Sequence, residues 1–171
     1  QTDKNPKKRS EGVSVFFVPK DSEGVTVVPL PKLGMRALCS CRITFDEVFV
    51  PDELLLGEEG QVWKETTNTL NNERIMNAAS CVGMLDGVLE DALEYMKIRK
   101  AFGRTIGEFQ ALQHYIADIS MGRKQAELML YNSAWLQSQG LPCAVEAAMT
   151  KTVASEYACQ AADKGISILG G

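Results

Sequence analysis

Apolar residues over positions 75–96 recur at offsets of three and four, which places them on one face of a helix. Asn71 and Asn72 are candidate N-cap residues for this helix, and Glu73 would lie in its first turn, where the helix dipole favours a carboxylate. The apolar pattern breaks at Phe102 and the glycine that follows it. The sequence therefore predicts one long helix that begins near residue 71 and ends in a sharp turn.

Two further apolar stripes follow, over positions 112–133 and 144–166. Gly140 and Pro142 separate them, and these residue types commonly end one helix and begin the next. The second of these stripes is rich in alanine and includes Ile166. Small side chains let neighbouring helices pack closely, so the sequence predicts an antiparallel helical bundle with short connections.

The first part of the chain follows a different pattern. Runs rich in β-branched and aromatic residues, at positions 12–18, 25–28 and 42–50, alternate with turns that contain glycine and proline. These runs predict an antiparallel sheet or part of a β-barrel. The change of pattern divides the chain into a β region, 1–60, and a helical region, 61–171, so the predicted fold class is α+β.

Composition and charge exclude several kinds of protein. The net charge is −4, and the one basic run, over residues 4–9, is short and interrupted by Pro6, so no nucleic-acid or anionic-membrane surface is predicted. No apolar run approaches the roughly 20 residues that a membrane-spanning helix needs, and we expect a soluble protein. The single histidine, His114, leaves no Ser-His-Asp triad or multi-histidine metal site, and we expect it on a helix surface.

The five cysteines are odd in number and widely spread along the chain. Their spacing fits neither a disulfide framework nor a zinc site built from paired CxxC motifs, and no metal site is predicted. We therefore expect reduced thiols, as in the cytoplasm of a bacterium or a mitochondrial matrix. Cys81 lies on or near the apolar stripe of the first predicted helix, where we expect it to pack in the core.

Four ordered motifs have the spacing of one enzyme family. Residues 99–110 follow the pattern R-x-x-F-G-x-x-I-x-x-F-Q across a helix end, a turn and the start of a second helix. Residues 32–36, 45–51 and 56–60 follow the patterns K-x-G-x-R, F-x-x-V-x-V-P and L-G-x-E-G in that order. With these motifs, nearly the whole sequence resembles part of the acyl-CoA dehydrogenase family.

This resemblance implies the latter part of the family's middle β-domain followed by most of its C-terminal helical domain. The family's N-terminal helical domain is absent from these residues, so we expect the central fragment of a family member. Members remove the α proton and the β hydride of an acyl-CoA thioester, pass the hydride to N5 of FAD and form the 2-enoyl-CoA. The implied partners are an acyl-CoA substrate, an electron-transferring flavoprotein as acceptor, and further copies of the chain in a homodimer or homotetramer.

Glu73 and Arg74 are the residues that the resemblance assigns to the substrate. The isovaleryl-CoA and long-chain branches have a catalytic glutamate directly before a helix arginine, and Glu73 occupies that position. Most members instead take the base from a segment that corresponds to residues downstream of Gly171. A further alternative is that Glu73 has no catalytic role and only stabilises the first turn of the helix. Arg74 matches the arginine that contacts the CoA portion of the ligand.

The implied FAD residues include Arg99, Phe102 and Gln110, which match residues that contact the FAD diphosphate and adenine from across a dimer interface. Arginine suits a diphosphate because it donates paired, charge-assisted hydrogen bonds. Gly170 and Gly171 resemble a glycine pair that lets backbone approach the adenine half of the flavin. The structural alternatives are a helix-dipole role for Arg99, turn packing for Phe102 and a helix cap for the glycine pair.

The resemblance also leaves alternatives for the function. Acyl-CoA oxidases share this chemistry but reoxidise the flavin with oxygen, and a family-derived scaffold for assembly would be non-catalytic. Ser167 stands where the family commonly has a glutamine that contacts the cofactor, so that hydrogen bond would be shortened or lost. These alternatives differ in the flavin content and the peroxide release that they predict.

Overall fold

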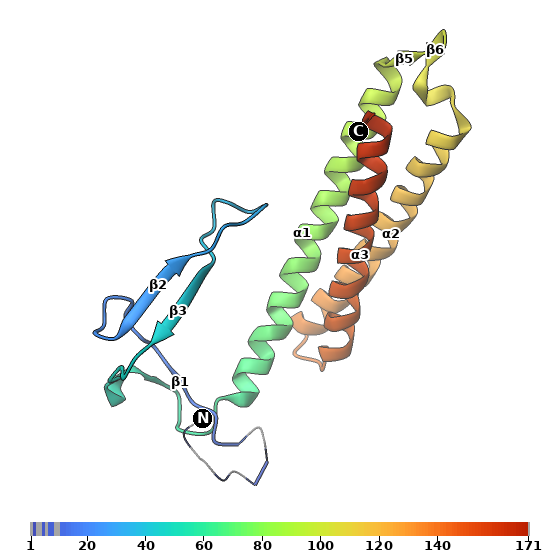
Figure 1. Cartoon of the computed structure of the whole chain (residues 1–171). Coiled ribbons are helices and arrows are strands. Elements are labelled where there is room, and N and C mark those ends of the chain that lie inside the picture. Colours follow the sequence, from blue (N-terminus) through green and yellow to red (C-terminus); the bar gives the residue numbers. More distant parts are fainter. Residues whose placement is uncertain (1, 3–4, 6, 9–10, 171) are drawn as a thin grey trace. The chain divides into compact units, whose positions relative to one another are not determined.

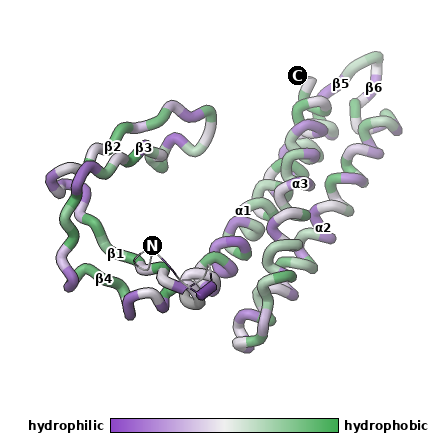
Figure 2. Tube along the Cα trace, turned by 60° about the horizontal axis from the view of Figure 1, so that its bottom comes forward, coloured by the Kyte–Doolittle hydropathy of each residue, from purple (hydrophilic) through white to green (hydrophobic). Residues whose placement is uncertain are grey.

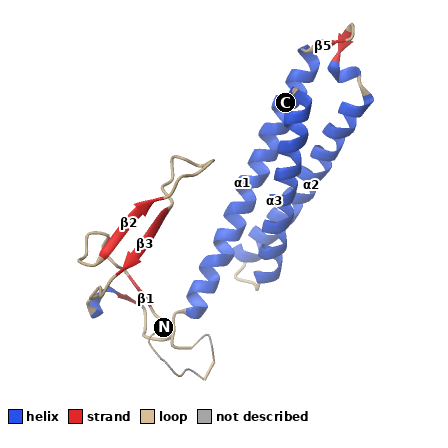
Figure 3. Cartoon of the chain, in the orientation of Figure 1, coloured by secondary structure: helices blue, strands red, loops and turns tan. Residues whose placement is uncertain are grey.

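The computed structural model describes residues 2, 5, 7, 8 and 11–170 (Figure 1). The chain forms two compact units, Gln1–Thr67 and Asn68–Gly171. We call the first the N-terminal unit, which contains short strands, and the second the helical unit, which contains most of the helices (Figure 3). The helix α1 (Trp63–Ile98) begins in the N-terminal unit and continues through the helical unit.

The described residues of the N-terminal unit form two separate antiparallel sheets of two strands each. β1 (Val15–Phe16) pairs with β4 (Leu55–Leu56), and β2 (Val25–Pro29) pairs with β3 (Cys41–Phe45). A 3-10 turn, η1 (Asp52–Leu54), precedes β4. The antiparallel pairing is as predicted, but the described residues form no closed barrel. A barrel needs a partner on both edges of every strand, and each strand here has one.

Two of the strands, β1 and β3, are shorter than the apolar runs that predicted them. The run 42–50 leaves the ladder after Phe45, and Glu47 then has a positive φ of 48°. Opposite this point, Gly24 has a φ of 82°, and a Cβ atom there would lie 2.0 Å from the backbone oxygen of Asp46. The N–H of Asp46 also donates to the carbonyl oxygen of Gly24 over 2.9 Å. Only glycine allows this close approach at the end of the sheet.

Three long helices make up the helical unit. α1 and α3 (Ala144–Leu169) run in the same direction, and α2 (Gln110–Ser138) runs in the opposite direction, so the bundle is antiparallel as predicted (Figure 1). Apolar residues are spread along all three helices among polar ones (Figure 2). In the described part of the chain, no helix is both long and apolar enough to cross a membrane.

α1 begins earlier than the sequence pattern predicted. Its first residue is Trp63, and the hydroxyl of Thr66 donates to the carbonyl oxygen of Val62, whose side chain is buried. Asn71 and Asn72 are therefore interior helix residues, and the prediction that they cap the helix is wrong. No glycine or proline stands between Trp63 and Asn72, and an asparagine pair only mildly disfavours a helix that already has a start.

A short β-hairpin connects α1 to α2, where the sequence predicted only a sharp turn. β5 (Lys100–Ala101) pairs with β6 (Arg104–Thr105), and a 3-10 turn, η2 (Ile106–Glu108), leads into α2. Phe102 and Gly103 form the two-residue loop, with φ angles of 52° and 82°. Two consecutive positive φ angles match the twist of paired strands, which is why the helical pattern breaks at this point.

The core of the helical unit contains small residues as well as large apolar ones. Leu85 on α1, Ala126 on α2 and Ala154 on α3 are each fully buried. A Cβ atom at Gly122 would lie 2.7 Å from the ring of Tyr157, so this glycine allows α2 and α3 to approach closely. The predicted packing of an alanine-rich face on α3 is therefore correct in its main feature.

Some residues of that α3 face were assigned wrongly, and Ile166 is the largest of them. Ile166 is 58% exposed, whereas Ile168 is buried together with Ala161 and Gly165. Ala161, Gly165 and Ile168 follow steps of four and three residues, which keeps them on one face. Ile166 lies one residue out of this register and therefore points away from the core.

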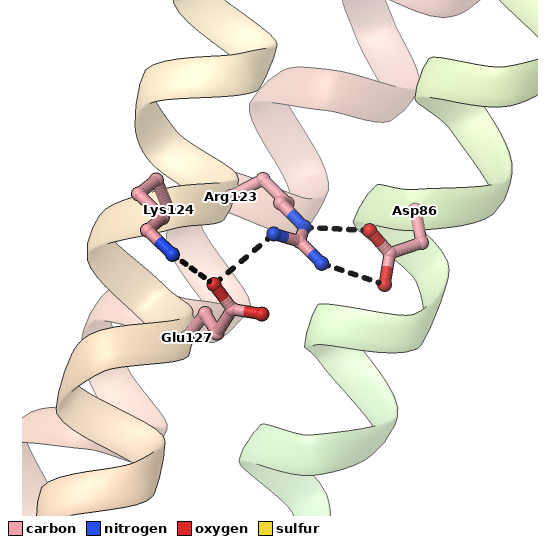
Figure 4. Close-up of polar contacts among 4 residues, drawn as sticks. All are labelled: Asp86, Arg123, Lys124 and Glu127. Atoms are coloured by element: carbon pink, nitrogen blue, oxygen red, sulfur yellow. Dashed lines mark hydrogen bonds and ion pairs between the residues drawn. The ribbon is translucent and has the colours of Figure 1, made fainter.

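A cluster of charged side chains joins α1 to α2 (Figure 4). The guanidinium of Arg123 donates from Nε and Nη2 to the two carboxylate oxygens of Asp86, over 2.6 and 3.4 Å. Its Nη1 donates over 3.1 Å to Oε2 of Glu127, which also accepts a hydrogen bond from Lys124 over 2.8 Å. The pKa of Glu127 is lowered, mainly because Lys124 donates a hydrogen bond to its carboxylate and secondarily through the charge of Arg123.

We expect Glu127→Gln to lower the thermal midpoint of unfolding at neutral pH and to have no effect in acid. A carboxylate whose pKa is lowered by folding stabilises the protein above its unfolded pKa, and this contribution is lost as the pH falls through the folded pKa. The measurement compares the midpoints of the two proteins from about pH 7 to about pH 2. Glu90→Gln, at an exposed position on α1, is the matched control. A constant difference over this range would contradict the role of Glu127.

Candidate functional site

Glu73, the predicted catalytic base, lies well inside α1. It is exposed, and it stands almost three turns after Trp63, the first residue of the helix. The first-turn interpretation of Glu73 is therefore wrong, because the dipole effect is confined to the terminal turn of a helix. Within the described part of the chain, the carboxylate of Glu73 makes no hydrogen bond or ion pair.

Arg74, the predicted CoA contact, is held by an amide on the same helix. Its Nη1 donates to Oδ1 of Asn71 over 2.8 Å, and its side chain is half-buried. The next residue, Asn72, accepts a hydrogen bond from Nε2 of Gln137 on α2 over 2.6 Å. These contacts could not be predicted from the sequence, because asparagine is also a common cap residue. The amides of Asn71 and Gln137 thus support the segment of α1 that carries Glu73 and Arg74.

Arg99 and Gln110, two of the predicted FAD residues, flank the hairpin. The N–H of Arg99 donates to the carbonyl oxygen of Tyr95, and its own carbonyl oxygen accepts from the N–H of Ile106, both over 2.9 Å. The exposed guanidinium makes no hydrogen bond or ion pair with any residue that the structure describes. Gln110 is the first residue of α2 and is also exposed. Arg99 follows the last residue of α1, so a helix-dipole role is compatible with its position.

Phe102, the third predicted FAD residue, lies at the tip of the hairpin and is 96% exposed. Its ring meets that of Phe109 edge to face, with centroids 6.2 Å apart and planes at 89°. The ring of Phe109 also contacts Arg104, whose guanidinium carbon lies 4.2 Å from the ring centroid. Packing in the turn therefore covers only a small part of the Phe102 ring.

Gly170 ends α3. It has a φ of 98°, and its N–H donates to the carbonyl oxygen of Ile166 over 3.0 Å, so the helix-cap interpretation is correct for this residue. Gly171, the second glycine of the predicted pair, lies outside the described residues. Ser167, which replaces the family's glutamine, is exposed one turn before Gly170.

The predicted site residues of the helical unit form two groups. Arg99, Phe102 and Gln110 lie with Gly170 at the end of the bundle that carries the β5–β6 hairpin (Figure 1). Glu73 lies on α1, whose last residue directly precedes Arg99, and about 1.5 Å per residue places the two roughly 39 Å apart. The substrate residues and the cofactor residues of one chain are therefore far apart.

An open cavity of about 390 Å³ lies beside the hairpin, between the end of α1 and the start of α2. Arg99, Phe102 and Gln110 do not line it. The predicted FAD residues are therefore presented on the surface of this chain and do not enclose a pocket within it. The residues that line the cavity are Leu93, Met96, Lys97, Thr105, Gly107, Glu108, Gln113 and Ile116.

Two further residues of the helical unit, His114 and Cys81, occupy the positions that the sequence predicted. His114 is exposed on α2, as predicted. Cys81 is half-buried and packs against the core, also as predicted, and burial raises the pKa of its thiol. Among the residues that the structure describes, no three His, Cys, Asp or Glu side chains are grouped so that they could hold a metal ion.

Known proteins with similar sequences share one family. The profile described as "Acyl-CoA dehydrogenase, C-terminal domain" matches residues 60–171. The mitochondrial short/branched chain specific acyl-CoA dehydrogenase of Bos taurus is 40% identical over 162 residues, covering 94% of this chain and 38% of the relative. The short-chain specific acyl-CoA dehydrogenase of Clostridium acetobutylicum is 34% identical over 165 residues, covering 96% of this chain and 44% of the relative.

Several solved structures have the same fold as this chain. Butyryl-CoA dehydrogenase from Megasphaera elsdenii has a TM-score of 0.89 at 32% identity, covering 98% of this chain and 44% of that protein. PigA with FAD and proline has a TM-score of 0.87 at 33% identity, with coverages of 98% and 44%. The prolyl acyl carrier protein oxidase AnaB has a TM-score of 0.89 at 28% identity, with coverages of 94% and 43%.

The chain thus spans less than half the length of the relatives and structures that it matches. The profile match covers the whole helical unit, and the sequence matches extend into the N-terminal unit. The ordered motifs, the antiparallel bundle and these matches agree. This chain belongs to the acyl-CoA dehydrogenase family.

Proposed function

We propose that this chain is part of a FAD-dependent enzyme that converts an acyl-CoA thioester to the 2-enoyl-CoA. The observation that carries the proposal is the arrangement of α1, which has Glu73 and Arg74 near one end and the R-x-x-F-G motif at the other. Bound FAD would supply the acceptor for the β hydride at flavin N5. The residues of this chain would supply the base, a contact to CoA and contacts to the cofactor.

The residues at the hairpin fit a cofactor that contains a diphosphate. Arg99 offers a guanidinium with no partner in the described part of the chain, and its paired donors suit two phosphate oxygens. Phe102 adds an exposed ring and Gln110 an exposed amide at the same end of the bundle. Gly170 has no Cβ atom that would obstruct an approaching ligand, and the sequence resemblance extends this role to Gly171.

We infer that these residues contact a flavin held by a second copy of the chain. Roughly 39 Å separates Glu73 from Arg99, which exceeds the length of an extended FAD molecule, so one chain cannot place both residues around one flavin. α2 also presents large apolar side chains, each more than half exposed, at spacings that keep them on one face. Their burial between copies would stabilise the proposed homodimer or homotetramer. These α2 residues are Met121, Leu128, Tyr131 and Trp135.

We propose Glu73 as the base that takes the α proton and Arg74 as the contact to CoA. The carboxylate of Glu73 is exposed, and its position in the interior of α1 removes the helix dipole as an explanation. The hydrogen bond from Arg74 to Asn71 would orient the guanidinium before a ligand arrives. An acyl chain that excludes water from a carboxylate strengthens it as a base. The competing candidate is a glutamate downstream of Gly171, which most family members use.

The N-terminal unit, the electron acceptor and the location of the protein complete the proposed function. We propose that residues 1–60 form part of a larger β-barrel domain, since β2 and β3 each have an unpaired edge among the described strands. The proposed electron acceptor is an electron-transferring flavoprotein. The proposed location is the cytoplasm of a bacterium or a mitochondrial matrix, and the relatives include a mitochondrial enzyme and one from the bacterium Clostridium acetobutylicum.

The test is anaerobic reduction of the flavin in the intact natural protein. We expect an acyl-CoA to bleach the flavin and a dye acceptor to reoxidise it, with no peroxide formed during turnover in air. The name of AnaB supports an oxidase as the second candidate, and substantial peroxide during turnover would favour it. Purified protein that is colourless and does not take up FAD would favour the non-catalytic scaffold.

We expect Arg99→Ala to weaken FAD binding by roughly 10- to 100-fold, because hydrogen bonds to a charged group contribute about 1.5–3 kcal/mol. The measurements are the flavin-to-protein absorbance ratio after purification and a titration of apoprotein with FAD. Lys100→Ala, which removes a neighbouring positive charge, is the control and should retain its flavin. An unchanged ratio in Arg99→Ala would remove this residue from the cofactor site.

A further inference from the structure

Two cysteine side chains of the N-terminal unit face each other on either side of Ser40. The Sγ atoms of Cys39 and Cys41 lie 3.3 Å apart, which is within hydrogen-bond distance for sulfur. Cys39 is exposed and Cys41 is half-buried. Cys41 is the first residue of β3 and pairs with Pro29 of β2, so the ladder fixes the backbone of one partner. The pair is therefore both organised and accessible in the described chain.

The loop before this pair is organised by a lysine. The Nζ of Lys32 donates to the carbonyl oxygen of Met35 over 2.8 Å and also to that of Leu38, the residue before Cys39. This places a positive charge close enough to act on the thiol of Cys41. The pKa of Cys41 is nevertheless raised, first by its hydrogen bond with Cys39 and then by burial. Cys41 thus stays a thiol more readily, and the exposed Cys39 is the first sulfur that a reagent can reach.

We propose that Cys39 and Cys41 are a covalent modification site, a dithiol that exchanges with low-molecular-weight disulfides of the type R–S–S–R. The thiolate of Cys39 attacks one sulfur, the S–S bond breaks and RS⁻ leaves, so Cys39 carries a mixed disulfide. Cys41 then loses its proton to water and attacks the Cys39 sulfur, which expels the second RS⁻. The protein loses two electrons and two protons, and these are recovered in two molecules of RSH.

The second step is favoured by the geometry of the pair. The two sulfurs need to move from 3.3 Å to a bond length of about 2.05 Å, a change that side-chain rotation and a small backbone adjustment can supply. Because Cys41 is held beside Cys39, it competes with external thiols at a high effective concentration. The mixed disulfide on Cys39 should therefore be short-lived. Cys159, exposed on α3, has no sulfur within hydrogen-bond distance in the described chain, and the half-buried Cys81 interacts with it only over a longer distance.

The experiment treats the protein with glutathione disulfide, blocks remaining thiols with N-ethylmaleimide and digests with trypsin. Cleavage after Arg36 and Arg42 releases residues 37–42, which contain both cysteines of the pair and no other cysteine. We expect this peptide to lose the mass of two hydrogen atoms and to carry neither glutathione nor maleimide. Under the same conditions the peptide with Cys159 should carry glutathione, which shows that the reagent is active.

The decisive comparison is with Cys41→Ser, which keeps the first step and removes the second. This variant should accumulate glutathione on Cys39 to at least about tenfold the wild-type level, and dithiothreitol should remove it. Equal glutathione on residues 37–42 in both proteins would overturn the proposal. A wild-type peptide fully blocked by maleimide while Cys159 reacts, or a disulfide between two chains, would overturn it as well.

Discussion

Replacement of Glu73 by glutamine is expected to slow reduction of the flavin by acyl-CoA by about 10³- to 10⁴-fold, or roughly 4–5.4 kcal/mol of activation free energy. Glutamine keeps the size of the side chain and most of its hydrogen-bonding capacity, but it cannot accept the α proton. Ligand binding should be nearly unchanged, because Arg74 and its hydrogen bond to Asn71 remain. The variant therefore separates the role of a base from that of a binding residue.

The measurement is single-turnover bleaching of flavin absorbance by a saturating acyl-CoA in the intact natural protein. Glu90→Gln removes another exposed carboxylate from α1 and should leave the rate unchanged. A loss of less than about tenfold in Glu73→Gln, or roughly 1.4 kcal/mol, would show that the base lies elsewhere. The glutamate downstream of Gly171 would then be the better candidate.

The position of Glu73 in the structure removes one alternative explanation of the expected result. A first-turn carboxylate would stabilise α1 by about 0.3–1 kcal/mol through the helix dipole, and its loss would disturb the fold as well as the reaction. Because α1 begins at Trp63, this contribution does not apply to Glu73. We therefore expect Glu73→Gln to have a thermal midpoint close to that of the wild type.

Leu85→Ala is expected to lower the free energy of unfolding of the helical unit by about 2–5 kcal/mol. Leu85 is fully buried in the core among residues of all three helices, so truncation removes apolar contacts and leaves a cavity. The spread in the expected value reflects how far the surrounding side chains can relax. The measurement is chemical denaturation followed by circular dichroism, at several protein concentrations that are matched between the variants and the wild type.

Leu128→Ala is the matched control, because Leu128 is 59% exposed on α2 and the chemical change is the same. We expect it to cost less than about 0.5 kcal/mol within a folded chain. If Leu128 is buried between copies, as proposed, its effect should shrink on dilution as the copies of both proteins dissociate, whereas the effect of Leu85 should persist. Equal losses for the two variants at every concentration would contradict the assignment of Leu85 to the core.

The features that were predicted correctly from the sequence are those that depend on neighbouring residues within one segment. The apolar spacing of α1, α2 and α3 is a property of each segment, and it indicated three helices and much of their inner faces. The pair Phe102 and Gly103 marked a break because two positive φ angles are needed there. The spacing of residues 99–110 indicated the family, which the profile match over residues 60–171 supports independently.

Features that depend on several segments at once needed the tertiary structure. The start of α1 was misplaced because a helix continues until something stops it, and Asn71 and Asn72 instead serve Arg74 and Gln137. The buried face of α3 contains Ile168 and not Ile166, since close packing selects among apolar residues that a stripe alone does not rank.

The distances between site residues show most clearly what the sequence alone could not predict. From the chain alone, Glu73 and Arg99 are two motif residues of one family, but a continuous helix holds them roughly 39 Å apart. Conversely, Cys39 and Cys41 looked like unrelated thiols in an odd set of five, and their rotamers bring the two sulfurs within 3.3 Å. Sequence patterns determine which face of an element a residue occupies, whereas the length of a helix and the choice of rotamer decide which side chains meet.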